Sequence, residues 1–299
     1  MEEEFLQIMP LGAGCEVGRS CVYLECKGRK IMLDCGLHPA REGIQSLPYF
    51  DAINPDELDL LVLTHFHVDH CAGLPYFLEK TGFKGRVFTT HPTKSIYNYI
   101  AQDFVKVSNI STDEQIFDQE DVIKSMKKIV MVDYHQECEE RGVKFTAYRA
   151  GHVLGAAMFL IEIDGVRILY TGDYSREEDR HLKPAEIPQN IEVDVLIVES
   201  TYGVEKHENR DMRETKFKQV VHDIVRRGGK CLMPCFALGR AQELLLILNE
   251  YWKKHPELKN VPIIYSGSLA QRSLEVFKTH RNMMSDELRI ELERGHNPF

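Results

Sequence analysis

Three histidines and an aspartate fall within six residues at the end of an apolar run, in LLVLTHFHVDH. His65, His67, Asp69 and His70 all carry side chains that bind divalent cations, and crowding them together is unfavourable without one. In extended backbone, residues two apart share a face, so His65 and His67 point the same way while Asp69 and His70 project differently. The spacing predicts ligands for two adjacent metal ions. Because the set holds no thiolate, Zn²⁺ is favoured over Mn²⁺ or Fe²⁺.

Other polar residues follow strand-like runs in the same way. Asp34, Asp173 and Glu199 each come just after an apolar segment, and ligands tend to collect at one end of strands. A hairpin turned at Asp164-Gly165 would pair residues whose numbers sum to about 329, which brings His152 close to Asp173. Taken alone, Asp34 or Glu199 is equally well explained as a turn or cap residue.

Strands dominate the first two thirds of the predicted fold, and strand–helix alternation follows. A hairpin is expected around Lys27-Gly28, and a helix with a Ser111–Glu114 capping box after residue 110. The predicted strands are 20–26, 29–36, 58–64, 156–163, 166–175 and 193–200, and the predicted helices are 93–107 and 111–129. Beyond residue 205, helices at 206–229, 239–254 and 268–280 alternate with strands at 230–234 and 261–266, which predicts parallel α/β units. We therefore divide the chain into domains 1–204 and 205–299.

Composition narrows the functional classes. The chain has 299 residues, 43% hydrophobic and 28% charged, with a formal net charge of −9. It has no apolar run long enough to span a membrane and no signal-peptide pattern at its start, so we expect an intracellular protein without a membrane partner. The eight cysteines form no CxxC pair and are expected to be reduced. An acidic chain that acts on nucleic acid needs a local basic surface, metal ions or basic partner subunits.

The motifs together resemble a known family. HFHVDH fits the HxHxDH motif of the metallo-β-lactamase superfamily, and LDCG, AGHVLGAAMF and YTGDYS fit its other motifs in the same order. VESTYG, followed by the α/β segment, resembles the β-CASP branch of nucleic-acid nucleases, and in particular those that cut pre-mRNA before polyadenylation. The resemblance implies an α/β fold, a metallo-β-lactamase αββα sandwich that is incomplete at its C-terminal end, followed by part of a β-CASP domain.

The resemblance also assigns roles to the polar residues. It implies that a water activated between two zinc ions attacks an RNA phosphodiester. His65, His67 and His152 would hold the first zinc, Asp69 and His70 would help hold the second, and Asp173 would bridge them. Asp69 and Asp34 are expected at the catalytic centre, with Asp34 orienting ligands, and Glu199 would act with a family histidine as general acid.

Two histidines of the family pattern are missing from this sequence, the last ligand of the second zinc and the general-acid partner. His207, His222, His255, His280 and His296 match neither and are expected to be surface or helix residues. We therefore expect an N-terminal portion of a longer enzyme, with low or no activity alone and a second zinc site that is weak or empty.

The partners follow from the resemblance and from one helix start. In PCFALGRAQE, Gly239 and Arg240 open a helix whose N–H groups favour an anion, so we expect them to contact RNA phosphate; an exposed arginine without a role is the alternative. Expected partners are pre-mRNA and other subunits of a nuclear cleavage and polyadenylation complex, including a non-catalytic sister subunit. Three alternative functions stay open: a related RNA or DNA nuclease of the Integrator type, a hydrolase of thioesters or lactams, and a non-catalytic scaffold.

Overall fold

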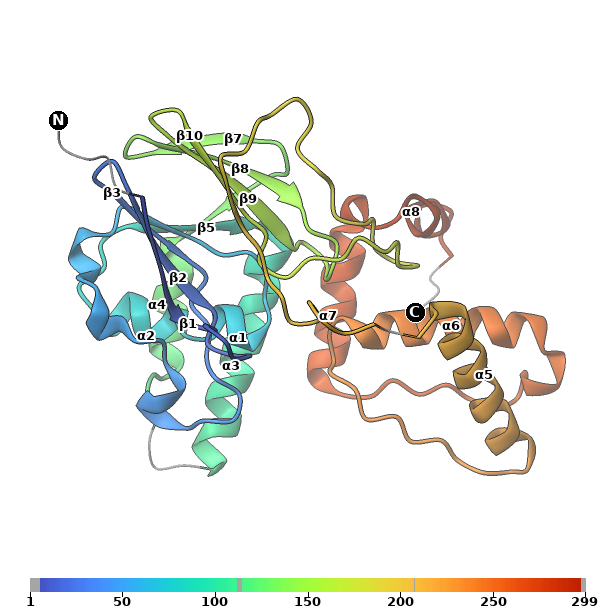
Figure 1. Cartoon of the computed structure of the whole chain (residues 1–299). Coiled ribbons are helices and arrows are strands. Elements are labelled where there is room, and N and C mark those ends of the chain that lie inside the picture. Colours follow the sequence, from blue (N-terminus) through green and yellow to red (C-terminus); the bar gives the residue numbers. More distant parts are fainter. Residues whose placement is uncertain (1–5, 112–114, 207, 297–299) are drawn as a thin grey trace. The chain divides into compact units, whose positions relative to one another are not determined.

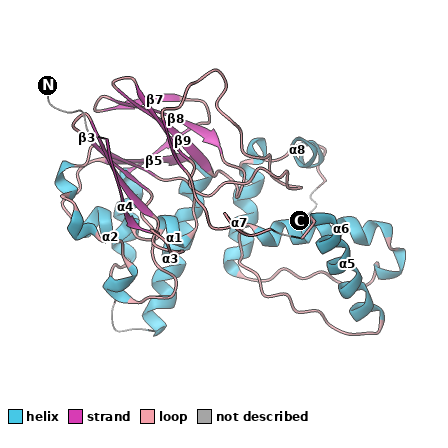
Figure 2. Cartoon of the chain, viewed as in Figure 1, coloured by secondary structure: helices cyan, strands magenta, loops and turns pink. Residues whose placement is uncertain are grey.

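The computed structural model describes residues 6–111, 115–206 and 208–296, and the side chains of all of these except 108–111. Contacts divide the chain into two compact units, Met1–Glu177 with Pro184–Glu199, and Glu178–Lys183 with Ser200–Phe299. The sequence-based boundary at residue 204 stays a prediction. In the described residues, the strands all lie in the first unit, and the second consists of helices and loops (Figure 2). None of the described helices combines the length and the apolar character needed to cross a membrane.

Two sheets form the first unit (Figure 1). The six-stranded sheet follows chain order: β1 (Leu6–Gly12), β2 (Cys21–Cys26), β3 (Arg29–Leu33), β4 (Leu60–Val62), β5 (Arg86–Thr90) and β6 (Ile129–Val132). Its strands are antiparallel from β1 to β3 and parallel from β3 to β6. The five-stranded sheet has the order β11 (Val195–Ile197), β10 (Val166–Tyr170), β9 (Ala157–Ile163), β8 (Val143–Arg149) and β7 (Glu137–Glu140). Only β10 and β11 run parallel within it.

Both predicted hairpins are confirmed, and their turns have the backbone that the sequence requires. Lys27 and Gly28 have φ of 48° and 75°, and Asp164 and Gly165 have φ of 45° and 86°. Positive φ at both central residues matches the right-handed twist of the flanking strands. The second turn pairs Ile163 with Val166, which is the register that the turn predicted.

The core of the first unit has two layers because its central strands are apolar on both faces. Leu60 and Val62 of β4 point into the cluster between the two sheets, whereas Leu61 points into the cluster under the helices. The helices of this unit are α1 (Val68–Cys71), α2 (Leu74–Lys80), α3 (His91–Ser111) and α4 (Gln119–Lys128), with short 3₁₀ turns η1 (Gly43–Ser46), η2 (Phe50–Ala52) and η3 (Pro55–Glu57). Each fully buried leucine contributes about 1.5–3 kcal/mol, so this double burial fixes the strand ends that carry the polar residues.

One predicted helix begins later than expected. The prediction placed its start at Ser111, but Ser111 ends α3 and α4 begins at Gln119. Glu114 of the predicted capping box lies outside the described residues. A second box starts α4: Asp118 accepts from the Asp121 backbone N–H at 2.9 Å, and Asp121 accepts from that of Asp118 at 3.0 Å. This reciprocal capping satisfies free N–H groups at the helix start.

The second unit contains α5 (Arg210–Arg226), α6 (Arg240–Lys254), η4 (Pro256–Leu258), α7 (Ser268–Thr279), η5 (Arg281–Met283) and α8 (Asp286–Glu293). The three long helices were predicted, but the strands expected at 230–234 and 261–266 were wrong, and with them the parallel α/β units. In the described part of the chain both segments are irregular, with Leu232 90% and Ile264 80% exposed. A strand requires a neighbouring backbone to satisfy its N–H and C=O groups, and no described segment supplies that ladder.

Candidate metal centre

Four strands of the first unit are each followed by a predicted polar residue. Asp34 follows β3 and His65 follows β4, which are parallel neighbours. Asp173 follows β10 and Glu199 follows β11, which are also parallel neighbours. The Ala157 N–H donates to the Thr64 carbonyl at 2.9 Å, so the loop that carries the first histidines is tied directly to the start of β9. The prediction that a polar residue follows each of these strands is confirmed.

Three imidazoles and a carboxylate form the first part of the cluster. His67 Nδ1 lies 3.1 Å from His65 Nε2 and 3.1 Å from His152 Nε2. Asp173 Oδ2 lies 3.5 Å from His152 Nε2 and 3.9 Å from His65 Nε2. Tetrahedral zinc with bonds of about 2.0–2.1 Å separates its ligand atoms by roughly 3.3 Å. The four donor atoms therefore have the spacing that one zinc ion requires, and the predicted proximity of His152 to Asp173 is confirmed.

Asp173 also faces the second part of the cluster with its other oxygen. Asp173 Oδ1 lies 3.3 Å from His70 Nε2, and Asp69 Oδ2 lies 3.9 Å from the same nitrogen. The Ser20 hydroxyl is 3.3 Å from that nitrogen as well. The carboxylate of Asp173 thus has one oxygen toward each group of histidines, which is the arrangement needed to bridge two ions.

Asp34 is fully buried and forms hydrogen bonds that orient residues of the cluster. Its carboxylate accepts from the Thr64 backbone N–H at 2.7 Å and from the Thr64 hydroxyl at 2.8 Å. His70 Nδ1 lies 2.8 Å from Asp34 Oδ2, which fixes the ring so that Nε2 faces Asp173. The Tyr170 hydroxyl donates to the same oxygen at 2.8 Å. Sequence reasoning found Asp34 but missed Thr64 and Tyr170, because both belong to strand-like runs and carry no distinguishing spacing.

The electrostatics of the cluster suit a cation. Burial, reinforced by His70, His67 and His152, holds the pKa of His65 well below its usual value, so the ring stays neutral and keeps a free lone pair. Burial tends to raise the pKa of Asp173, but the hydrogen bond and charge of His70 outweigh it and lower that pKa to about 2. His65 thus offers a neutral imidazole and Asp173 a carboxylate, and both are donors that fit a divalent metal such as zinc.

A glycine permits the close approach that positions Asp69 and His70. A Cβ added to Gly36 would lie 1.6 Å from the Asp69 carbonyl oxygen. The neighbouring Cys35 N–H donates to the His70 carbonyl at 2.8 Å, and the Ser20 N–H donates to the Asp69 carbonyl at 2.7 Å. The LDCG segment and the start of α1 are thus joined backbone to backbone.

Three further residues were predicted to take part in the site. Glu199 is half-buried in the first unit, two residues beyond β11. Gly239 caps α6 with φ of 92°, and Arg240 is the exposed first residue of that helix, both in the second unit. Their roles toward RNA and leaving group stay predictions.

Glu243, in the first turn of α6, was not singled out from the sequence. Its carboxylate accepts from Arg210 at 2.6 Å and from Arg180 at 3.1 Å, and it lies 3.2 Å from His181 Nδ1. These contacts lower its pKa to about 2 although burial opposes the shift. The Glu243 carboxylate therefore places a negative charge in the first turn of α6.

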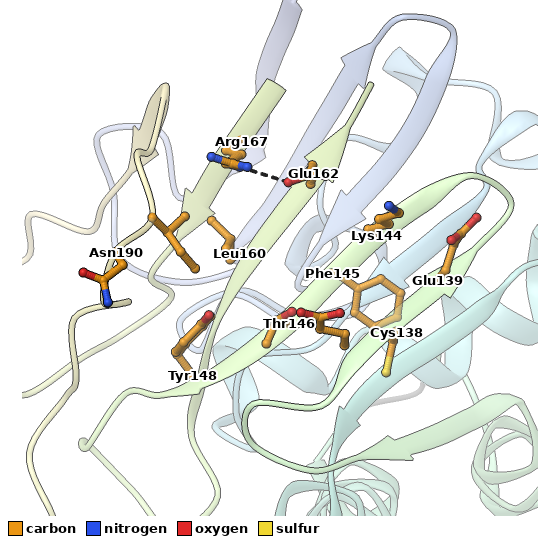
Figure 3. A pocket seen from close by; sticks show the side chains of 12 residues that line it. Cys138, Glu139, Lys144, Phe145, Thr146, Tyr148, Leu160, Glu162, Arg167 and Asn190 are labelled. Carbon is orange, nitrogen blue, oxygen red and sulfur yellow. Dashed lines mark hydrogen bonds and ion pairs between the residues drawn. The ribbon is translucent and has the colours of Figure 1, made fainter. Parts of the chain in front are cut away.

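A cavity on the first unit is lined by none of these residues. It measures roughly 530 Å³ and lies on the outer face of the second sheet, lined among others by Lys144, Thr146, Tyr148 and Glu162 (Figure 3). Arg167 Nε lies 2.9 Å from Glu162 Oε2 on the same face. The alternation of β8 sends Phe145 and Ala147 inward and these polar neighbours outward.

Known proteins resemble the chain along its whole length. The family model described as a metallo-beta-lactamase superfamily domain matches residues 23–200, and the Beta-Casp domain model matches residues 241–299. The chain is 56% identical to cleavage and polyadenylation specificity factor subunit 3-I of Arabidopsis thaliana, over 98% of this chain and 42% of that protein. It is 56% identical to cleavage and polyadenylation specificity factor 73 of Drosophila melanogaster, over 100% of this chain and 43% of that protein.

Two further matches agree. Endoribonuclease ysh1 of Schizosaccharomyces pombe is 52% identical over 99% of this chain and 39% of its own length. A crystal structure of a protein of unknown function from Enterococcus faecalis V583 shares the fold, with a TM-score of 0.54, 14% identity and coverage of 91% of this chain and 68% of that one. The chain thus spans about two fifths of the length of the curated relatives. With the histidine–aspartate cluster at its strand ends and both domain models matched, the chain belongs to the metallo-β-lactamase superfamily and carries a β-CASP segment.

Proposed function

We propose that this chain is the metal-binding part of an endoribonuclease that cuts pre-mRNA at its 3′ end before polyadenylation. Relatives at 50–56% identity are named as cleavage and polyadenylation specificity factors or as endoribonucleases, and those names support the substrate. The observation that carries the proposal is the Asp173 carboxylate, whose Oδ2 faces His65 and His152 and whose Oδ1 faces His70.

The ligand assignment follows from the donor atoms. His65, His67 and His152 would hold a first zinc, and Asp69 with His70 would help to hold a second, with Asp173 between them. When bound, zinc supplies Lewis acidity that activates a water for attack on phosphorus and offsets charge on the phosphate. Among the described residues, Asp69, His70 and Asp173 lie where the second ion would bind.

The remaining roles belong to side chains of the protein. Asp34 orients His70 through the 2.8 Å contact to Nδ1, and such outer contacts fix ligand geometry. Asp34 and Asp69 would complete the catalytic set, and Glu199 would assist proton delivery to the leaving oxygen. Gly239 and Arg240 would contact RNA phosphate through the start of α6. The partners would be pre-mRNA and the other subunits of a nuclear cleavage and polyadenylation complex, including a non-catalytic sister subunit.

The test is cleavage of a labelled pre-mRNA by the full-length protein in its complex, comparing wild type with His67→Ala. We expect the variant to lose cutting while the complex still assembles. Undiminished cutting by the variant would rule out the nuclease assignment in favour of a scaffold. A matching single-stranded DNA substrate, expected to stay intact, separates this function from that of a related DNA nuclease.

A further inference from the structure

A second group of potential metal ligands lies in the second unit. It consists of His222 on α5, His255 at the end of α6 and Glu257 in η4. One ligand atom from each residue lies within 4.8 Å of the others. Glu257 Oε1 is 2.9 Å from His255 Nδ1 and 4.0 Å from His222 Nε2. These distances bracket the roughly 3.3 Å between ligand atoms of tetrahedral zinc.

The backbone holds two of these residues in a short, rigid turn. His255 caps α6, and its N–H donates to the Trp252 carbonyl at 3.1 Å. Pro256 restricts φ to one narrow range, and the Leu258 N–H closes the turn onto the His255 carbonyl at 3.0 Å. Leu258 is 2% exposed and anchors the turn in the core. His255 and Glu257 are therefore presented together before any ion binds.

A tyrosine orients the third residue. The Tyr251 hydroxyl lies 3.1 Å from His222 Nδ1, on the ring side away from Glu257. The Tyr251 ring also contacts the His255 ring, with 4.0 Å between centroids and an angle of 36° between the planes. In the tautomer whose Nδ1–H donates to the Tyr251 oxygen, Nε2 carries the lone pair, which is the role that outer partners of ligating histidines have. Both histidine rings are thus oriented by one side chain.

Charge also favours a cation at this place. His222 lies about one turn before the end of α5, and His255 directly follows the last residue of α6. The C-terminal end of a helix carries about half a negative charge, whose effect is confined to the last turn, so the end of α6 favours a cation at His255. Arg226 lines the same pocket, and its positive charge repels a bound cation. The negative charge of the Glu257 carboxylate offsets this repulsion.

We propose that His222, His255 and Glu257 form a zinc site separate from the superfamily's metal centre. Two imidazoles and one carboxylate are a suitable zinc donor set, with a fourth position left for water. The ion would join α5 to the end of α6 and so stabilise the β-CASP segment when bound. The inference does not depend on the proposed nuclease function, because all three ligands lie within the second unit.

Zinc stoichiometry tests the proposal. The metal-free chain is dialysed against buffered free zinc, and zinc per chain is measured for wild type, Glu257→Gln and His222→Ala. We expect each variant to bind one zinc fewer than wild type, and His152→Ala combined with Glu257→Gln to lose both ions. Far-ultraviolet circular dichroism checks folding, and Glu257→Gln alters an exposed carboxylate, so it keeps the test valid if His222→Ala misfolds.

The matched control is His91→Ala. His91 Nε2 lies 3.8 Å from Asp133 Oδ1, and among the described residues this pair belongs to no group of three possible metal ligands. Its zinc count should equal that of wild type. Equal zinc counts in wild type and Glu257→Gln, or an equal loss in His91→Ala, would overturn the proposal.

Discussion

Removing the Tyr170 hydroxyl tests whether Asp34 is the buried support of the metal centre. Tyr170 is 6% exposed, and its hydroxyl donates to Asp34 Oδ2 at 2.8 Å. A hydrogen bond to a charged acceptor contributes about 1.5–3 kcal/mol. Oδ2 keeps the Thr64 hydroxyl and His70 as partners, each at 2.8 Å, so Tyr170→Phe leaves no orphaned oxygen. We therefore expect Tyr170→Phe to lower the free energy of unfolding by about 1.5–2 kcal/mol, near the lower end of that range.

The assay is urea unfolding of the metal-free chain, with Tyr97→Phe as the matched control. Tyr97 is fully buried, and its hydroxyl pairs with the neutral Ser125 hydroxyl at 2.7 Å, a type of bond that contributes about 0.5–1.5 kcal/mol. Because His70 is oriented through Asp34, Tyr170→Phe should also weaken zinc binding, whereas Tyr97→Phe should not. If Tyr170→Phe costs no more than Tyr97→Phe and zinc affinity is unchanged, the reasoning about Asp34 fails.

Three further outcomes are expected. Gly36→Ala should lower the free energy of unfolding by about 3 kcal/mol or more, because its Cβ would lie 1.6 Å from the Asp69 carbonyl oxygen. Gly28→Ala has nothing within 4 Å of its Cβ and should lower it by only about 1–2 kcal/mol, the strain of a left-handed backbone. Similar melting temperatures for the two variants would contradict this expectation. Because the pKa of Glu243 falls to about 2 in the fold from an ordinary 4.5, its contribution to stability is complete above pH 4.5 and is lost as the pH falls toward 2. The free energy of unfolding, measured across that pH range, should change less steeply with pH for Glu243→Gln than for wild type. Equal slopes for the two proteins would refute the expectation. His152→Ala should reduce zinc affinity by more than the 10–100-fold typical of outer partners, measured by competition with a chelator; a smaller effect would remove His152 from the ligand set.

Local spacing alone determined much of the first unit. The turns at Lys27-Gly28 and Asp164-Gly165 follow from residues that tolerate positive φ, and the second turn fixed the register that brings His152 near Asp173. The crowded HFHVDH run indicated a cation site because its residue types have no other common reason to gather. These features depend on neighbours in sequence, so the sequence alone was sufficient.

Tertiary structure decided what depends on partners distant in the chain. The strands expected at 230–234 and 261–266 have good local patterns but no described neighbour to pair with, and they remain irregular. The hydrogen bond from Tyr170 to Asp34, the arginine partners of Glu243 and the meeting of His222 with Glu257 join residues from separate elements. No spacing rule predicts such meetings, because the packing of helices and sheets, and not the order of residues, brings these side chains together.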